Sequence, residues 1–516
     1  MVALGLAVTA VPGGVVAASA QPSGSSLTAV DVQLEWPNLD PELDNQAAND
    51  VDLLNAVYGE LFTLRPSAGC QGACKDPGTV VPSMAKGYSV SPDGKTFTIE
   101  LRKGMTFQDG TPFNSEAVKY NIERDLSKES PCLCKTNFSL VQSVTTDGPY
   151  AVQLHLSQRD VPLLYGFVDQ APNWIASPTA IKKMGIAKFG QMPVGAGPFQ
   201  VVRNRASAEL DLKKFSGYFQ KGHPLLDSLK FISVGNDNSA VSALQAGTAQ
   251  VVIGASTPQV IDQARQQFDV PTVPPVVVGT VEFNTKVAPF NNQKAREAIA
   301  YATDPGPIAQ KLFGDLGGSA QDQVGPGNQF FQKNVPTYRH YNLNKAKALV
   351  KQLGGLKFDY ITTNVPLQAE LGVVLQQEWA QAGIKATVDS MPLTKEVADF
   401  ESGNWSALAG SAGGPDPDVG VQSIPSRFAS NGTFTCCHDP KLDALINQSI
   451  ATTGHSARQA VFNKIYSYID QKQYAVDVYT TKYAVIAKKG LKGITPTIAA
   501  APASVALPWA SVGLNG

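Results

Sequence analysis

The sequence predicts an α/β fold that is divided into more than one domain, and three observations support this. The chain has 516 residues, of which 43% are hydrophobic, so it can bury a large core. At ~150 residues per domain, this length corresponds to about two to four domains. Strand-like runs at 358–363 and 384–388 flank a helical run at 367–382 that ends at Gly383. This order is typical of a right-handed βαβ unit in an α/β lobe.

The beginning of the chain has the pattern of an export segment. Its apolar residues end in Ala18-Ser19-Ala20, a small-x-small pattern that precedes signal cleavage, so we expect residues 1–26 to be a secretory signal. Because no Lys or Arg precedes Arg65, the alternatives are a truncated start or a segment that is no signal. The run is too short to span a bilayer, and no later stretch is expected to cross one. No Cys follows it, so the sequence does not support a lipid anchor.

The cysteines and the charge narrow the class of protein. The six cysteines form three close pairs: Cys70/Cys74, Cys132/Cys134 and Cys436/Cys437. An even count in an exported chain favours disulfides, and six cysteines allow fifteen connectivities. A bridge between adjacent Cys436 and Cys437 would be strained, which leaves pairing between the clusters open. Cys436-Cys437-His438 lacks zinc-type spacing, so no metal site is predicted. The formal net charge of -1 argues against nucleic acid as a partner.

The clearest secondary-structure pattern in the sequence lies between residues 82 and 124. Pro92-Asp93-Gly94-Lys95 predicts a turn, because Pro presets φ and Gly accepts a positive φ. The run 96–101 then alternates between apolar and polar residues, which predicts a half-buried strand. After a second turn at 108–112, Asn114 or Ser115 can cap a helix.

Further elements follow from the same patterns of periodicity and capping. We expect strands at 27–35, 145–156, 229–234 and 474–485, and helices at 51–62, 239–247, 341–354 and 457–470. Ala295, Ala298, Ile299 and Ala302 share one helical face. The glycine-rich run 192–198 precedes a strand-like FQVV rather than a helix, so it predicts a tight loop and not a phosphate cradle.

These runs also resemble a known family. SPDGKTFTIELRKGMTFQDGTPF and EAVKYNIER look like the signature region of the extracellular solute-binding proteins of family 5, the oligopeptide-, dipeptide- and nickel-binding components of ABC importers. MPVGAGPF at 192–199 and EFNTKVAPFNNQKAREAIAYATD at 282–304 resemble later family segments, in the family's order. The resemblance extends from about residue 35 to about residue 495, nearly the whole mature chain.

The resemblance implies a two-lobed periplasmic-binding-protein-like fold of type II, with an extra subdomain and hinged lobes around a central cleft. It implies the following division: lobe I at 27–55, 180–278 and 480–516, the extra subdomain at 56–179, and lobe II at 279–479. The chain would cross between the lobes near 279–284 and 476–482, with Phe283 and Asn284 at the first crossing.

The resemblance also implies which residues line the ligand pocket. The loop 404–419 resembles a pocket-lining segment, and Asp416-Pro417-Asp418 matches the family's DPD. Ser411 stands where an aromatic is common, and Gly413-Gly414 stands where peptide binders carry an Asp that pairs with the ligand's α-ammonium. The implied ligand-binding residues are Asn45, Gln46, Trp405, Gly410, Ser411, Ala412, Gly413, Gly414, Asp416 and Tyr479.

Each of these assignments has an alternative. Trp405 and Tyr479 can be core residues, and Asp416-Pro417-Asp418 can be a plain turn beside Gly413-Gly414. Another carboxylate, such as Asp44 or Glu35, can replace the missing Asp, or the ligand can lack a free amine. The absence of that Asp weakens the peptide interpretation, because losing one partner of a buried charge pair costs a few kcal/mol of binding free energy.

The family implies an exported, monomeric binding protein that hands a peptide-like solute to the permease of an ABC importer and needs no cofactor. The sequence has no G-x-S-x-G, H-E-x-x-H or P-loop motif, which argues against an enzyme. Three alternatives remain open: a binding protein for a nickel chelate, glycoside or other amine-free ligand, a secreted hydrolase on this scaffold, and a sensory protein that binds a membrane receptor.

Overall fold

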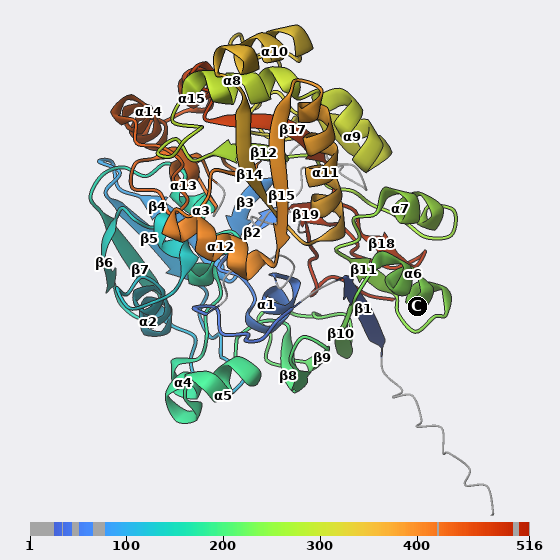
Figure 1. Cartoon of the computed structure of the whole chain (residues 1–516). Coiled ribbons are helices and arrows are strands. Elements are labelled where there is room, and N and C mark those ends of the chain that lie inside the picture. The colour runs from blue at the N-terminus through green and yellow to red at the C-terminus, as the bar shows by residue number, and fades with distance from the viewer. Residues whose placement is uncertain are drawn as a thin grey trace, which may run out of the picture.

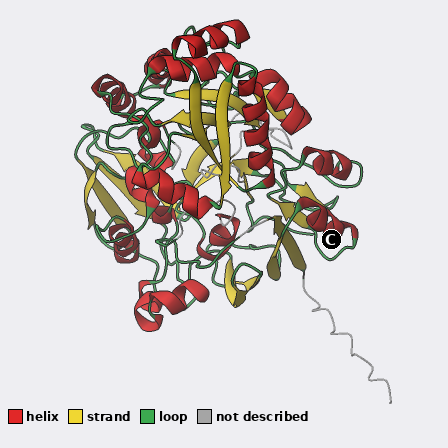
Figure 2. Ribbon diagram, viewed as in Figure 1, coloured by secondary structure: helices red, strands yellow, loops and turns green. Residues whose placement is uncertain are grey.

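The structure contains two large sheets that lie in separate parts of the molecule. It is a computed structural model that describes residues 25–32, 35–43, 51–65, 78–420, 423–498 and 505–514. The described strands form two six-stranded sheets, one four-stranded sheet and two two-stranded sheets. Helices cover the six-stranded sheets, and the four-stranded sheet lies to the left of both (Figures 1 and 2). We call the part around the first six-stranded sheet lobe I, the part around the second lobe II, and the part around the four-stranded sheet the subdomain.

The lobe I sheet is assembled from segments far apart in the sequence. Its order is β18-β11-β1-β10-β9-β8, with β1 (Ser26–Val32), β8 (Phe199–Arg205), β9 (Glu209–Lys214), β10 (Ser228–Val234), β11 (Val251–Ile253) and β18 (Ile486–Ala487). Strand β1 is parallel to both β10 and β11, and pairs Ala29 with Phe231 and Val251. The helices of lobe I are α1 (Val51–Tyr58), α6 (Asp237–Gln245) and α7 (Pro258–Ala264). The C-terminal hairpin β19 (Thr497–Ile498) and β20 (Val505–Ala506) follows.

The subdomain confirms the strand and the helix cap that we predicted between residues 82 and 124. Strand β5 is Thr96–Leu101, and its buried residues alternate as expected, with Phe97, Ile99 and Leu101 inside. Asn114 is the cap of α2, because its side chain accepts from Ala117 N at 3.0 Å. The sheet order is β4-β5-β7-β6, with β4 (Ala85–Val90), β6 (Val141–Thr146) and β7 (Ala151–Leu156), beside the hairpin β2 (Phe62–Arg65) and β3 (Thr79–Pro82).

One strand prediction in this region is wrong. The run 145–156 is not a single strand but a hairpin, in which β6 and β7 are antiparallel and joined by a turn at 147–150. The other elements are α2 (Ser115–Asp125), η1 (Leu133–Thr136), α3 (Leu163–Gly166), η2 (Ala171–Asn173), α4 (Pro178–Met184) and α5 (Ile186–Gln191). The predicted tight loop precedes β8: a Cβ at Gly197 would lie 2.4 Å from Gly59 N, so only glycine fits this close crossing.

Lobe II contains the predicted βαβ unit. The strands β14 (Leu356–Thr363) and β15 (Ile384–Met391) are parallel and are joined by α11 (Pro366–Ala380). The sheet order is β13-β17-β12-β16-β14-β15, with β12 (Val277–Phe283), β13 (Gly317–Ser319), β16 (Ala407–Gly413) and β17 (Ala475–Thr481). The helices are α8 (Gln293–Ala302), α9 (Pro305–Phe313), η3 (Gly314–Leu316), α10 (Leu343–Gln352), α12 (Leu393–Ser402), α13 (Ile424–Phe428), α14 (Pro440–Ala451) and α15 (His455–Lys472). The predicted apolar face of α8 is buried.

Two antiparallel segments, 269–276 and 482–487, join the two sheets. Asp269 and Ala487 exchange backbone hydrogen bonds of 2.9 and 2.8 Å, and Val273 N donates to Tyr483 O at 3.0 Å. The placement of Phe283 and Asn284 at the crossing is therefore wrong. Strand β12 first runs through the lobe II sheet, so Phe283 is buried in the lobe II core and the Asn284 side chain donates to Trp405 O at 3.0 Å.

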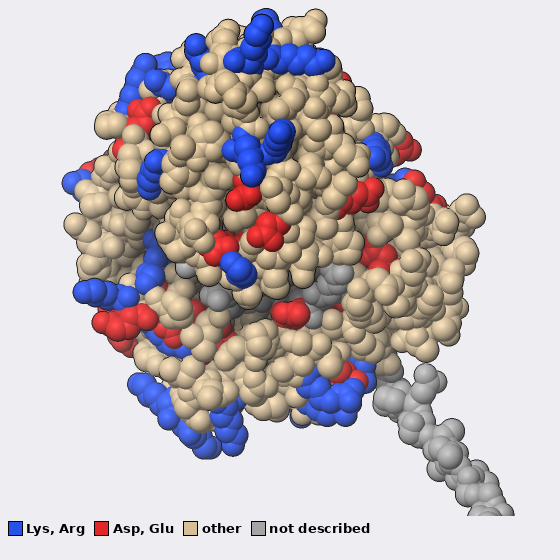
Figure 3. Space-filling model, viewed as in Figure 1, with Lys and Arg blue, Asp and Glu red and all other residues tan. Residues whose placement is uncertain are grey.

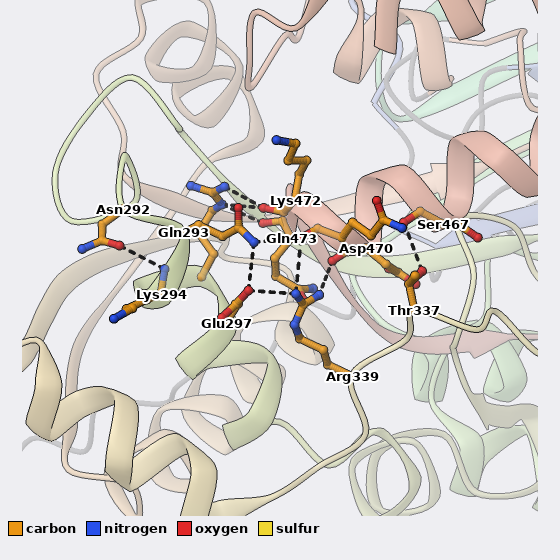
Figure 4. Close-up of polar contacts among 12 residues, drawn as sticks. Asn292, Gln293, Lys294, Glu297, Thr337, Arg339, Ser467, Asp470, Lys472 and Gln473 are labelled. Carbon is orange, nitrogen blue, oxygen red and sulfur yellow. Dashed lines mark hydrogen bonds and ion pairs between the residues drawn. The ribbon is translucent and has the colours of Figure 1, made fainter. Parts of the chain in front are cut away.

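Polar contacts at the end of α15 fix the chain where it turns into β17. Arg339 donates to Glu297 at 2.8 Å and to the Gln473 side chain at 3.0 Å, while Gln293 donates to Gln471 O at 2.8 Å (Figure 4). Arg296 donates to Gln473 O at 2.9 Å. These cations and amides occupy the carbonyls that every helix leaves unpaired at its C-terminus. The cluster therefore has a structural role.

The cysteines do not pair between clusters among the described residues. Cys132 is bonded to Cys134, and Cys436 and Cys437 are free, buried thiols. Cys70 and Cys74 lie outside the described residues. Within the described ranges, no group of three or more His, Cys, Asp and Glu side chains could hold a metal ion. No helix in the same ranges is long and apolar enough to span a membrane.

Candidate binding site

Strand β16 and the loop after it carry most of the predicted site residues, and close packing explains the glycines among them. A Cβ at Gly410 would lie 2.2 Å from Glu282 Oε1, because the Glu282 side chain crosses over this position from β12. A Cβ at Gly413 would lie 2.3 Å from Val276 O, and Gly413 also has a φ of +101°. The backbone of the sheet therefore requires glycine at position 413, whereas at position 410 the Glu282 side chain occupies the space that a Cβ would need.

The other small residues of this loop differ in exposure. Ser411 pairs with Gly279 on β12 and is half-buried, whereas Ala412 is buried against Val278. Gly414 accepts a hydrogen bond from the Asn328 side chain through its carbonyl oxygen, at 2.7 Å. Around Gly413 and Gly414 the lobe thus presents backbone rather than side chains.

Asp416 lies in a buried ion cluster inside lobe II. Arg458 on α15 donates to both carboxylate oxygens of Asp416, at 2.7 and 2.9 Å, and to Asp418 at 2.8 Å. Ser449 donates to the second oxygen of Asp418 at 2.9 Å. Burial and the neighbouring Asp416 raise the pKa of Asp418 to about 7, although Arg458 opposes the shift. Asp416 thus forms part of a structural ion pair, which argues against a direct contact with a ligand.

Both predicted aromatic residues pack in the core of lobe II. Trp405 is 6% exposed, and its ring lies 4.6 Å from the ring of Phe400. The Tyr479 ring is stacked on Phe313 at 4.3 Å, and its hydroxyl accepts from the Gln368 side chain at 2.9 Å. Their burial fits the core alternative for both residues. Asn45, Gln46 and the substitute Asp44 lie outside the described residues, and Glu35 is exposed beyond β1.

The loop that follows β16 contacts the subdomain. The Asn137 side chain accepts from Gly420 N at 3.0 Å, and the Thr136 and Thr433 hydroxyls are 2.7 Å apart. Val161 N donates to Ile450 O at 2.9 Å. Beside this contact, burial together with Asp418 and Asp416 raises the pKa of Asp160 to about 7. The subdomain and lobe II therefore meet along one side of the region where the predicted site residues lie.

A polar network behind Gly410 was not predicted. Arg427, which is 0% exposed, donates to Glu282 at 2.7 Å, to Gln323 at 3.0 Å and to Thr280 at 3.3 Å. Gln323 in turn donates to Asp477 at 2.6 Å, and burial raises the pKa of Asp477 to about 7. The polar Thr280 and Glu282 within the apolar run of β12 were the available signal. No local pattern in the sequence indicated the position of their partner Arg427, which lies far along the chain.

The face of the molecule seen in Figure 3 has no patch of one dominant charge. Basic and acidic side chains both occur across the visible face, without one dominant sign (Figure 3). This distribution suits small-solute binding better than binding to a polyanion, which needs a basic surface.

Comparison with known proteins identifies relatives along most of the chain. The curated relatives include the glutathione-binding protein GsiB of Salmonella choleraesuis (strain SC-B67), which is 30% identical over 405 residues, 75% of this chain and 77% of that protein. GsiB of Escherichia coli (strain K12) is 27% identical over 429 residues, 80% of this chain and 82% of that protein.

Solved structures show the same fold at lower sequence identity. AgaA from A. tumefacien R10, in complex with agropinic acid, has a TM-score of 0.81 at 22% identity and covers 95% of this chain and 99% of its own. DppA from Helicobacter pylori, in complex with the peptide STSA, has a TM-score of 0.81 at 19% identity and covers 96% and 99%. The two-lobed α/β fold is therefore that of periplasmic binding proteins. Residues 79–433 match "Bacterial extracellular solute-binding proteins, family 5 Middle", and the chain belongs to this family of solute-binding proteins of ABC importers.

Proposed function

We propose that this protein captures a peptide-like solute between lobes I and II, outside the cytoplasm, and delivers it as a monomer to the permease subunits of an ABC importer. Relatives of this chain support a peptide-like solute. GsiB is named as a glutathione-binding protein, and structural neighbours hold the peptide STSA and the dipeptide Met-Leu. The export signal that the sequence predicts at 1–26 agrees with this location.

The observation that carries the proposal is the pair of segments that joins the lobes. Only 269–276 and 482–487 connect the two large sheets among the described residues, and they pair with each other as an antiparallel ribbon. Two connections of this kind allow one lobe to rotate against the other. A solute that contacts both lobes then shifts the population toward the closed form.

We propose the domain division that the resemblance implies: lobe I at 27–55, 180–278 and 480–516, the subdomain at 56–179, and lobe II at 279–479. The strands of each sheet fall within these ranges except for one or two residues at the ends of β1, β12 and β17, which supports the division. The hinge would then lie in 269–276 and 482–487, next to the proposed boundaries.

A second candidate is an amine-free ligand, and the loop after β16 favours it. Residues 410–414 carry no carboxylate, and Asp416 has both oxygens bound by Arg458. A ligand ammonium placed there would lack an ionised partner, unless backbone carbonyls or residues outside the described ranges supply one. The structural neighbours include complexes with agropinic acid and mannopinic acid.

Native mass spectrometry of protein purified without denaturation separates these candidates. A ligand present at a hundredfold over its Kd stabilises the folded protein by ~2.7 kcal/mol. A ligand that dissociates slowly also stays bound when the free ligand is removed during purification. We expect the native mass to exceed the denatured mass by a heterogeneous ladder of amino-acid residue masses. A single non-peptide mass would overturn the peptide assignment and identify the amine-free class. A peptide or ester panel incubated with the same protein should show no turnover.

A further inference from the structure

The subdomain shares its hydrophobic core with lobe I. One cluster of buried side chains contains Phe97 of the subdomain together with Phe231 of lobe I. Among the described residues, this cluster extends no further into lobe II than Val277, at the start of β12. The side chain of Gln108 in the subdomain also donates to Phe199 O of lobe I at 2.7 Å. The subdomain and lobe I therefore form one body when lobe II rotates.

The contact between the subdomain and lobe II consists of separate polar contacts. Asn137, Thr136 and Val161 each form the hydrogen bond to lobe II described above. In addition, Gln329 of lobe II donates to the Tyr165 hydroxyl at 3.5 Å. Each such bond contributes little net free energy, so this contact can open and close. Because the subdomain stays with lobe I, these bonds break when lobe II moves away.

Asp160 lies in this contact, beside the ion cluster of lobe II. The residue after Asp160 donates its backbone N–H to Ile450 O at 2.9 Å. Ile450 follows Ser449, which donates to Asp418 at 2.9 Å and accepts from Arg458 Nε at 3.2 Å. Asp160 is only partly exposed. The contact therefore brings a carboxyl group of the subdomain to the cluster around Arg458.

The ion cluster has no spare positive charge for Asp160. Arg458 already donates to both Asp416 and Asp418. An ionised Asp160 would place a third carboxylate beside one guanidinium, and like charges at such a distance repel in a site of low dielectric. Burial, together with Asp418 and Asp416, raises the pKa of Asp160 to about 7, although Arg458 opposes the shift. In the closed contact Asp160 therefore favours its protonated form.

The other titratable groups at this contact leave that balance unchanged. Burial raises the pKa values of Tyr165 and Tyr466, so both hydroxyls stay neutral. Arg159 donates from its guanidinium to the backbone of the β4–β5 turn. His455 stacks on the Phe330 ring at 5.0 Å. Histidines generally change charge between pH 5 and pH 8, so His455 requires a control of its own.

We propose that the subdomain is a proton-sensitive latch on lobe II, which Asp160 fastens when it is protonated and releases when it ionises. This proposal rests on the opening and closing of the lobes proposed above. The contribution of Asp160 is complete below its ordinary pKa of about 4 and is lost as the pH rises through about 7, when the proton passes to the solvent. Because Arg458 also binds Asp416, at the end of the loop 410–416, the latch acts beside the predicted ligand loop. Solute affinity should therefore fall as the pH rises.

Amide hydrogen exchange of the full chain measures the latch, because two amides donate across the contact. Val161 N donates to Ile450 O, and Gly420 N donates to the Asn137 side chain. We expect the protection factors of both amides, corrected for the intrinsic rate at each pH, to fall at least tenfold between pH 5 and pH 8. Unchanged protection would overturn the latch. Thr285 N, which is bonded within lobe II, is the control amide, and an equal fall there would trace the change to the whole fold and overturn the latch as well.

The variant Asp160→Asn tests the residue itself. An amide keeps the shape of the carboxyl group and does not ionise, so at pH 8 Val161 and Gly420 should be protected at least tenfold more in the variant than in the wild type. Lower protection in the variant at both pH values would show a merely structural role and would overturn the proposal. Asp147→Asn, at an exposed position of the same subdomain, is the matched control and should follow the wild type. Circular dichroism confirms folding, and Asp160→Ser replaces Asp160→Asn if the latter does not fold.

A second variant, His455→Gln, separates the two groups that could hold the proton. It should keep the wild-type fall in protection between pH 5 and pH 8. If the fall disappears in His455→Gln and persists in Asp160→Asn, the assignment to Asp160 is overturned. Native mass spectrometry keeps this test apart from the proposed function. An intact adduct without a pH response would contradict the latch alone, and a pH response in a protein that binds no solute would contradict the proposed function alone.

Discussion

At the residue scale, the charged residues of the DPD segment are buried and form ion pairs within lobe II. The residues Asp416 and Asp418 match a family motif in the sequence. In the structure, both carboxylates accept hydrogen bonds from Arg458, which lies on a helix about forty residues later in the chain. A single sequence does not show this partner, because ion pairs between distant segments leave no local pattern. It does show the glycines: Gly410 and Gly413 were predicted to belong to the site, and the sheet explains why no larger residue fits there.

Arg458→Met is expected to destabilise the protein by about 3–5 kcal/mol, because it leaves Asp416 and Asp418 buried without their counter-ion. Urea unfolding followed by tryptophan fluorescence measures the loss. The control is Lys395→Met, which removes an exposed i,i+4 pair with Asp399 at 2.6 Å and should cost no more than about 0.5 kcal/mol. Similar small losses in both variants would contradict a stabilising role for the buried pair.

At the element scale, prediction succeeded where a local signal was complete. Strand β5 alternates without interruption, and α2 has both a cap and a periodic face, so their positions were confirmed. The crossing was misplaced because 276–283 is a mostly apolar, strand-like run, and such a run looks the same whether it connects two sheets or lies within one. The core contacts separate the two: Val276 and Val277 pack with lobe I, and Val281 and Phe283 with lobe II.

The cap of α2 gives a prediction for an element. Asn114→Ala should destabilise the protein by about 1 kcal/mol, because Ala117 N loses the acceptor that the Asn114 side chain provides at 3.0 Å. Thermal unfolding measures the change. Thr257 occupies the corresponding position before α7 without a side-chain cap hydrogen bond, so Thr257→Ala is the matched control and should have little effect. An equal loss in both variants would mean that the cap hydrogen bond contributes nothing.

At the scale of the whole molecule, carboxyl groups with raised pKa values occur in lobe I, in the subdomain and in lobe II. Burial and neighbouring acids raise the pKa to about 8 for Asp52 in lobe I, to about 7 for Asp160 in the subdomain, and to about 7 for Asp418 in lobe II. A carboxyl group whose pKa is raised on folding binds a proton more tightly in the folded state. Its contribution is complete below the unfolded pKa of about 4 and is lost as pH rises through the folded pKa. The free energy of unfolding should therefore fall between about pH 4 and pH 8.

A variant at Asp160 tests this pH dependence at one place, the contact between the subdomain and lobe II. Next to it, Val161 N donates to Ile450 O, and Asp416, Asp418 and Arg458 lie on the other side of the contact. In Asp160→Asn, denaturation at several pH values and constant ionic strength should show the slope of unfolding free energy against pH reduced by about one proton. Asp262→Asn, at an exposed position beside Arg265, should keep the wild-type slope. An unchanged slope in Asp160→Asn would mean that Asp160 takes up no proton when the subdomain and lobe II are in contact.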